Sequence, residues 1–233
     1  MRVAGALDAR DVDYRVSLDA NEQFADARAV AELFDAIEAE PALARLWAST
    51  LYVEQPIARG RALHEPVHAL GARKPLALDE SDEHAGVFAM ARGLGYAAIS
   101  SKSCKGVYRA LLNAARAACW NAELGEARHF MIAEDLTTQP GVAVQQDLAL
   151  AALVGATHVE RNGHHYVDGF AGAPSEEQRA FARAHPDLYR LGEDGRARLV
   201  IEGGAVSLES LRRVRGFAVE AVPEWAGARP LGA

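Results

Sequence analysis

The chain has few of the features that mark secreted, disulfide-linked or membrane-spanning proteins. Its 233 residues include two cysteines, Cys104 and Cys119, which form no CxxC pair and provide no disulfide framework. No run approaches the roughly 18 consecutive apolar residues that a membrane span requires. Residues 1–8 carry one positive charge and then turn acidic, unlike a signal peptide. We therefore expect a cytoplasmic protein with no membrane partner.

The sequence also lacks an excess of basic residues and a glycine-rich phosphate loop. Lysine and arginine number 25 against 32 acidic residues, so the net charge is −7, and the pI is near 5.6. This balance argues against a nucleic-acid partner. There is no GxGxxG after an apolar run and no Walker sequence. With half of its residues apolar, the chain has the composition of an ordinary globular domain.

Short apolar runs alternate with helix-like segments about every 25–35 residues. The predicted strands lie at 14–18, 51–54, 76–78, 96–100, 130–133 and 156–160. The predicted helices lie at 24–48 (divided at Pro41), 60–71, 81–93 or 81–95, 106–124 and 142–154, and Ser81 is the predicted N-cap of the third. Residues 1–13 are expected to be irregular. The strands lack alternation of apolar and polar residues, which indicates burial on both faces. This α/β pattern is typical of a (β/α) barrel or of a doubly wound sheet.

The β-α rhythm stops after Gly169. The remaining residues contain a short predicted helix at 176–184, a predicted strand pair around Gly203-Gly204, and a tail rich in proline and glycine. We therefore predict an α/β domain over residues 1–170 and an irregular C-terminal extension over residues 171–233.

Three acids follow the first three predicted strands: Asp19, Glu54 and Asp79. Because parallel strands in a barrel deliver their carboxyl ends to one face, these side chains are expected to converge. A hard cation such as Mg²⁺ prefers oxygen ligands of this kind. The alternative is that each acid caps the helix that follows it. One acid alone would be explained equally well in either way, but three together are hard to explain as caps.

The motifs around these acids resemble a known set. Asp19-Ala-Asn21, Glu54-Gln-Pro56 and Asp79-Glu-Ser81 are similar to the three successive metal-ligand motifs of the enolase superfamily, and most similar to its mandelate racemase and muconate-lactonizing-enzyme branches. The likeness covers roughly residues 14 to 170. It implies a TIM-type barrel and an enzyme, a lyase or an isomerase, that removes a proton α to a carboxylate while Mg²⁺, or Mn²⁺, stabilises the enediolate.

The same resemblance implies roles for further residues. Lys102 lies 23 residues after Asp79, near the acid/base lysine of muconate-lactonizing-like members. The family's Gly-Gly turn is reduced to Gly106, and an alignment on Gly106 would place Ser100 at the lysine position instead. The other alternative is that Lys102 and Lys105 are solvated residues at a helix start. Glu134 is the candidate second acid, and the residues predicted to contact a small carboxylate substrate, such as an acid sugar, are Asn21, Lys105 and Asp135.

Histidines provide weaker candidates. His64-Glu-Pro-Val-His68 fits the HExxH zinc motif, but Pro66 is expected to interrupt the regular helix that this motif needs. His129 lies at the end of its predicted strand opposite to Glu134, so the Asp–His dyad of the racemase branch is not expected. Near the last predicted strand, His158, His164 and His165 are interpreted as packed or exposed residues.

Parts that the resemblance would require are missing. No Lys-x-Lys precedes Asp19, no capping domain precedes the first strand, and six predicted strands stand where a closed barrel needs eight. We therefore expect an incomplete barrel of about six βα units, whose extension at 171–233 would normally pack toward the missing capping domain. The expected assembly is a homo-oligomer. The alternative function is that of a truncated, non-catalytic barrel with a metal-binding or structural role only.

Overall fold

The computed structural model describes residues 2–10, 12–134, 140–161, 163–170, 172–216 and 220–227. The chain forms two compact units. The first comprises Met1–Ser100 and Leu112–Met131, and the second comprises Ser101–Leu111 and Ile132–Ala233. The predicted boundary near residue 170 stays a prediction.

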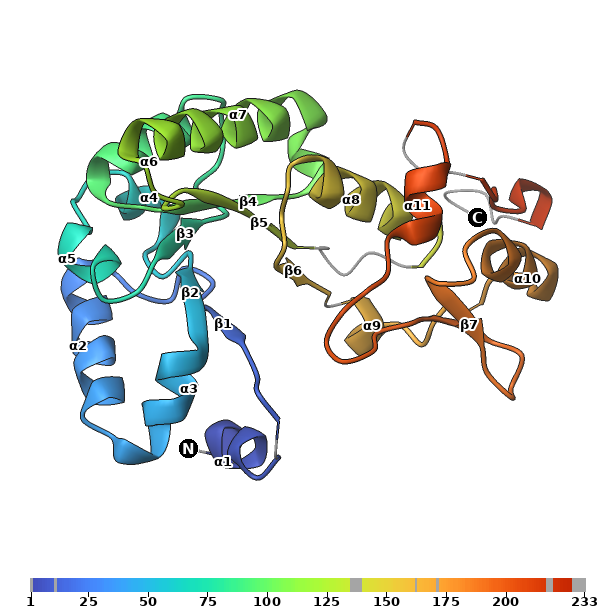
Figure 1. Cartoon of the computed structure of the whole chain (residues 1–233), viewed down its shortest axis with the longest axis horizontal. Coiled ribbons are helices and arrows are strands. Elements are labelled where there is room, and N and C mark those ends of the chain that lie inside the picture. Colours follow the sequence, from blue (N-terminus) through green and yellow to red (C-terminus); the bar gives the residue numbers. More distant parts are fainter. Residues whose placement is uncertain are drawn as a thin grey trace. The chain divides into compact units, whose positions relative to one another are not determined.

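Six parallel strands follow one another in the sheet in sequence order (Figure 1). They are β1 (Val16–Asp19), β2 (Thr50–Glu54), β3 (Leu76–Leu78), β4 (Ala98–Ser101), β5 (Phe130–Glu134) and β6 (Val159–Glu160). In a doubly wound sheet the order reverses at a switch point, and here it does not. The order is that of a (β/α) barrel with six of its eight strands. This confirms the predicted partial barrel and rules out the doubly wound alternative.

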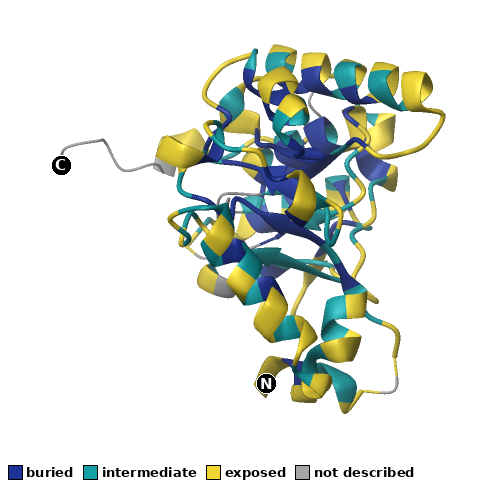
Figure 2. Ribbon diagram, turned by 90° about the vertical axis from the view of Figure 1, so that its left-hand side faces the viewer, coloured by how far each residue is buried: buried dark blue, intermediate teal, exposed yellow. Residues whose placement is uncertain are grey.

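Helices surround the strands of the first unit. They are α1 (Arg2–Asp8), α2 (Ala27–Glu38), η1 (Pro41–Leu43), α3 (Ala44–Ser49), α4 (Arg59–Ala62), α5 (His68–Gly71), α6 (Val87–Leu94) and the larger part of α7 (Val107–Leu124). All residues of β3 are fully buried, as the lack of alternation predicted. Figure 2 shows buried strands and helices whose outward faces are exposed. The aromatic ring of Phe88 packs against Trp120 at 5.0 Å between centroids, which joins α6 to α7.

The second unit has its own hydrophobic core. Its elements are η2 (Ser103–Lys105), the start of α7, α8 (Val142–Leu153), α9 (Gly163–Tyr166), α10 (Ser175–Ala184), the antiparallel pair β7 (Tyr189–Leu191) and β8 (Ala197–Leu199), α11 (Glu209–Arg213) and η3 (Trp225–Gly227). The rings of Phe170, Phe181 and Tyr189 lie 5.0 to 6.3 Å apart. Val144 and Leu148 of α8 belong to the same core. Consequently α8 and the segment after residue 170 stabilise each other.

Four of the predicted elements are wrong in part. Residues 2–8 form α1 rather than an irregular segment. The predicted helix at 60–71 is divided into α4 and α5, because Pro66 cannot supply a helical N–H. Ser81 does not cap a helix, since α6 begins at Val87 and the Ser81 hydroxyl accepts a hydrogen bond from Gln55 instead. The strand pair predicted around Gly203-Gly204 is found at β7 and β8, and only an isolated bridge flanks those glycines.

Within the described part of the chain, each helix is too short or too polar to cross a lipid bilayer.

Candidate functional site

Glu54 and Asp79 lie together at the carboxyl ends of β2 and β3 in the first unit. Glu54 is the last residue of β2, and Asp79 directly follows β3. The side chains are 1% and 3% exposed, and their carboxylate oxygens lie within 4.8 Å of each other. Each of these strands is formed by a short apolar run that is buried on both faces of the sheet. The first polar residue after the apolar run therefore lies at the end of the strand. The predicted convergence of these two acids is therefore observed.

Gln55 fixes the position of the turn that carries Asp79. Its side chain is fully buried. The amide nitrogen donates to the Ile57 carbonyl (2.9 Å) and to the Ser81 hydroxyl (2.7 Å). The amide oxygen accepts from the backbone N–H groups of Asp79 (2.8 Å) and Ser81 (3.2 Å). One side chain thus ties the end of β2 to the turn after β3.

The backbone is strained beside these acids. Asn21, Glu22 and Gln55 have φ angles of 44°, 64° and 30°, and among the described residues they are the only non-glycine residues with positive φ. Asparagine tolerates this conformation, whereas glutamate and glutamine adopt it rarely. The Arg59 guanidinium holds Glu22 with a contact of 2.6 Å. Strained residues of this kind concentrate at functional sites, so the cluster supports a site at this end of β1 and β2.

Asp19, the first predicted ligand, lies beside Glu54 in the register of β1 and β2. Its side chain is half-buried, and its carboxylate accepts hydrogen bonds from the backbone (2.9 Å) and the side-chain amide (2.6 Å) of Asn21. Asn21, which was predicted to contact substrate, is therefore held against Asp19. The assignment of Asp19 as a metal ligand stays a prediction.

The chemistry of Glu54 and Asp79 suits a divalent cation. Two buried carboxylates so close together repel each other and lose hydration, so their burial requires compensating positive charge. Carboxylate oxygens are the ligands that hard cations such as Mg²⁺ and Mn²⁺ prefer. This donor set fits such an ion and could bind it.

Lys102 and Glu134 form a buried ion pair in the second unit. Lys102 Nζ lies 2.5 Å from Glu134 Oε2, and the two side chains are 8% and 13% exposed. Lys102 directly follows β4, and Glu134 is the last residue of β5. The alternative of a solvated lysine at a helix start is therefore wrong for Lys102. Lys105 is half-buried in η2, and its backbone carbonyl accepts hydrogen bonds from Arg109.

Three charged residues of this unit were not predicted as candidate site residues. Glu160 lies beside Glu134 in the register of β5 and β6. Arg161 pairs with Asp147 at 2.8 Å, with side chains 5% and 3% exposed. Glu160 ends a predicted strand, so the rule that found Glu54 would have found it as well. Asp147 lies inside a helix with no sequence signal for a buried charge.

Comparison with solved structures shows a similarity to an enzyme of known structure. It is the muconate lactonizing enzyme from Pseudomonas putida, with a TM-score of 0.48 and 19% sequence identity, and the match covers 69% of this chain and 42% of that chain. The chain thus spans less than half the length of that enzyme. No protein-family model matches the sequence, and no curated protein matches it.

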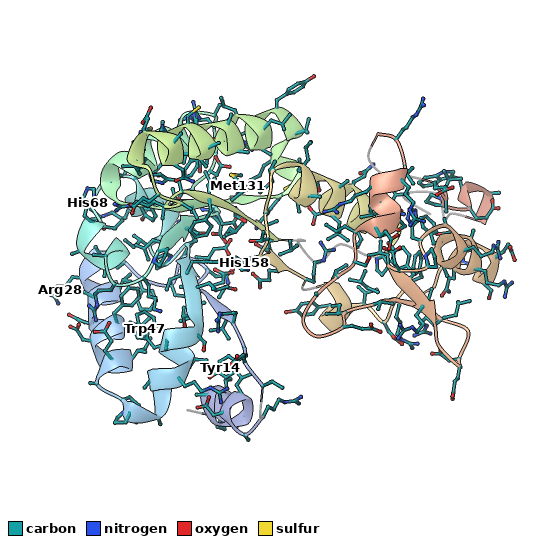
Figure 3. The ribbon with its side chains drawn as sticks, viewed as in Figure 1. Tyr14, Arg28, Trp47, His68, Met131 and His158 are labelled. Carbon is teal, nitrogen blue, oxygen red and sulfur yellow. The ribbon has the colours of Figure 1, made fainter. Side chains whose placement is uncertain are left out.

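The remaining candidates lie elsewhere or outside the described residues. Asp135 falls outside them, as do the side chains of His164 and His165. The HExxH histidines are not on one helix, because α4 ends at Ala62 and α5 begins at His68, as Pro66 predicted. Figure 3 labels His158, whose pKa burial lowers. His129 precedes β5 and is buried.

Proposed function

We propose that the chain binds a divalent cation, Mg²⁺ or Mn²⁺, through Glu54 and Asp79. The observation that carries the proposal is the buried Glu54–Asp79 pair, whose oxygens lie within 4.8 Å. Asp19 is the further candidate ligand.

We further propose that Lys102 transfers a proton at the carbon α to a substrate carboxylate. A cation bound by the acids would stabilise the negative charge that develops on the carboxylate oxygens of the substrate. The burial of Lys102 and its place directly after β4 support this role. The neighbouring Glu134 favours the ammonium form, which donates a proton. Lys102 would accept a proton only when another cation engages the charge of Glu134.

The substrate class that fits these parts is a small carboxylate such as an acid sugar, and the reaction class is that of a lyase or an isomerase. Asn21, Lys105 and Asp135 are the residues proposed to contact the substrate. Asn21 and Lys105 follow β1 and β4, respectively.

The test is exchange of the α-proton with solvent deuterium. The intact chain with Mn²⁺ would be incubated with a panel of α-hydroxy carboxylates and acid sugars in D₂O, and deuterium incorporation would be followed by NMR. We expect exchange of at least one compound, at least about 100-fold slower exchange in Lys102→Ala, and unchanged Mn²⁺ binding in that variant. Full exchange in Lys102→Ala would refute the role of the lysine.

Two further variants separate the metal from the lysine. Glu54→Gln should lose both exchange and Mn²⁺ binding. Glu32→Gln, which removes an acid that is 65% exposed on α2, should lose neither. Exchange that survives in Glu54→Gln would contradict the proposed ligand set.

The second candidate function is a non-catalytic barrel with a metal-binding or structural role. The strand count favours it, because the described sheet has six strands where a closed barrel has eight. On this reading Mn²⁺ binds, Glu54→Gln loses binding, and no carboxylate exchanges its α-proton.

A further inference from the structure

A polar pocket lies in the first unit, at the ends of the strands opposite to Glu54 and Asp79. Its volume is about 230 Å³. The lining residues include Tyr96, which precedes β4, and His129, which precedes β5. Because the strands are parallel, these residues mark the amino-terminal edge of the sheet. The pocket is therefore separate from the carboxylate pair.

The polar lining of this pocket is basic. It comprises His68, Arg92, Arg128 and His129, with the hydroxyl-bearing Tyr96, and no carboxylate contributes to the lining. This cluster of two arginines and two histidines is notable because the chain as a whole has a net charge of −7. Among these residues, His68 is labelled in Figure 3.

The two guanidinium groups are only partly neutralised. Arg92 stacks on the Trp120 ring at 4.7 Å, and its Nη2 lies 3.4 Å from Glu123 Oε2. The Arg128 side chain has no ion pair among the described residues; the hydrogen bonds of this residue are made by its backbone N–H, to the Asn121 side chain and to the Glu126 carbonyl. Arg92 is thus held in place, and Arg128 retains its full bonding capacity.

The pKa of His129 is sensitive to the positive charges that line the pocket. Burial lowers the pKa of His129, the bond of its ring to the Ala97 carbonyl raises it, and Arg92 and Arg128 lower it further. The ring is held by that bond (Nδ1 to carbonyl, 3.3 Å) and by an edge contact with Trp120 (5.3 Å). An anion placed here would relieve the repulsion among the three side chains.

The backbone on one side of the pocket is closely packed, where Gly95 approaches His68. Gly95 has a φ of 109°, and a Cβ at this position would lie 2.7 Å from the His68 backbone nitrogen. Only glycine permits that approach between α5 and the end of α6. The backbone that carries His68 is therefore held close to the end of α6.

We propose that this pocket binds a phosphate group. Guanidinium groups bind phosphate oxygens through paired, charge-assisted hydrogen bonds. The volume is below the range of pockets for drug-sized ligands, and it suits a group of this size. The site is independent of the proposed metal centre and of the reaction proposed there.

The experiment is a calorimetric titration of the intact chain with inorganic phosphate at pH 6.5, with sodium chloride keeping the ionic strength constant. We expect one site, at least about tenfold weaker binding in Arg128→Gln, and partial recovery in Arg128→Lys. The matched control is Arg28→Gln, which removes a charge that is 86% exposed on α2 of the same unit and should bind phosphate normally. Far-UV circular dichroism would verify that the variants fold.

A second readout follows the His129 ring by NMR. Since an anion favours the imidazolium form, phosphate should raise the pKa of His129, and Arg128→Gln should abolish that change. No phosphate binding above the chloride control would overturn the proposal. Equal binding by the chain and by Arg128→Gln would also overturn it.

Discussion

Gln55 shows how one side chain can place an acid that lies far away in the sequence. Its amide uses both donor and acceptor atoms on groups up to 26 residues later. Glutamine is suited to this position because the turn offers two N–H groups to one atom and two oxygens to the other. A local sequence pattern cannot predict such a bridge, which explains why Ser81 was predicted to be a helix cap.

Replacing Gln55 tests this role. Gln55→Leu should lower the free energy of unfolding by about 2–4 kcal/mol, because it leaves the N–H groups of Asp79 and Ser81 buried without their acceptor. Urea unfolding measures the effect. The exposed Gln23 provides the control, since Gln23→Leu should change the free energy by less than about 0.5 kcal/mol. Equal effects of the two substitutions would show that the bridge contributes nothing.

Asp187 gives a prediction about pH. Burial alone would raise its pKa, but hydrogen bonds from Ser207 and Ser210 outweigh burial and lower the pKa from 3.8 to about 2. Because the pKa is lower in the folded state, the ionised carboxylate stabilises the fold above pH 3.8. This stabilisation is lost as the pH falls toward 2. Ser207→Ala removes the 2.6 Å bond and should cost about 1 kcal/mol at pH 7, allowing for solvent screening.

The check is urea unfolding at several pH values. The difference between the chain and Ser207→Ala should shrink between pH 4 and pH 2, as Asp187 becomes protonated in both. A difference that stays constant across this range would contradict the assignment of the bond to the ionised carboxylate.

At the scale of elements, glycine and proline determine where the helices begin and end. Gly95, one of the two helix ends that the sequence predicted, ends α6 in the left-handed conformation. Pro66 was expected to interrupt the helix that the zinc motif needs, but the helix predicted at 60–71 was not divided there. In the structure that helix is divided into two. The short helix α1 lacks a strong amphipathic pattern, so nothing local predicted it.

Two neighbouring glycines provide a matched pair of substitutions. Gly95→Ala should lower the free energy of unfolding by about 2–4 kcal/mol, because it combines an unfavourable φ with a backbone clash at His68. Gly93→Ala, within α6 and in open space, should raise it by about 0.5–1 kcal/mol. Thermal or urea unfolding distinguishes the two. A neutral Gly95→Ala would show that the close approach to His68 is not required.

At the scale of the whole molecule, the sequence predicted the number and direction of the strands and the strand-end positions of the acids. Continuous apolar runs such as Leu76–Leu78 carry this information, because a run buried on both faces must be a central strand. The pairing of Lys102 with Glu134 and of Arg161 with Asp147 could not be predicted. Such pairs depend on tertiary contacts between residues 14 or 32 positions apart.

The central claim is that Glu54 and Asp79 hold a divalent cation, and calorimetric titration of the intact chain with Mg²⁺ and Mn²⁺ tests it most directly. The account predicts one saturable site, binding at least about tenfold weaker in Glu54→Gln, and unchanged binding in the exposed-acid control Glu32→Gln. The absence of binding to the intact chain, or equal binding by Glu54→Gln, would contradict it.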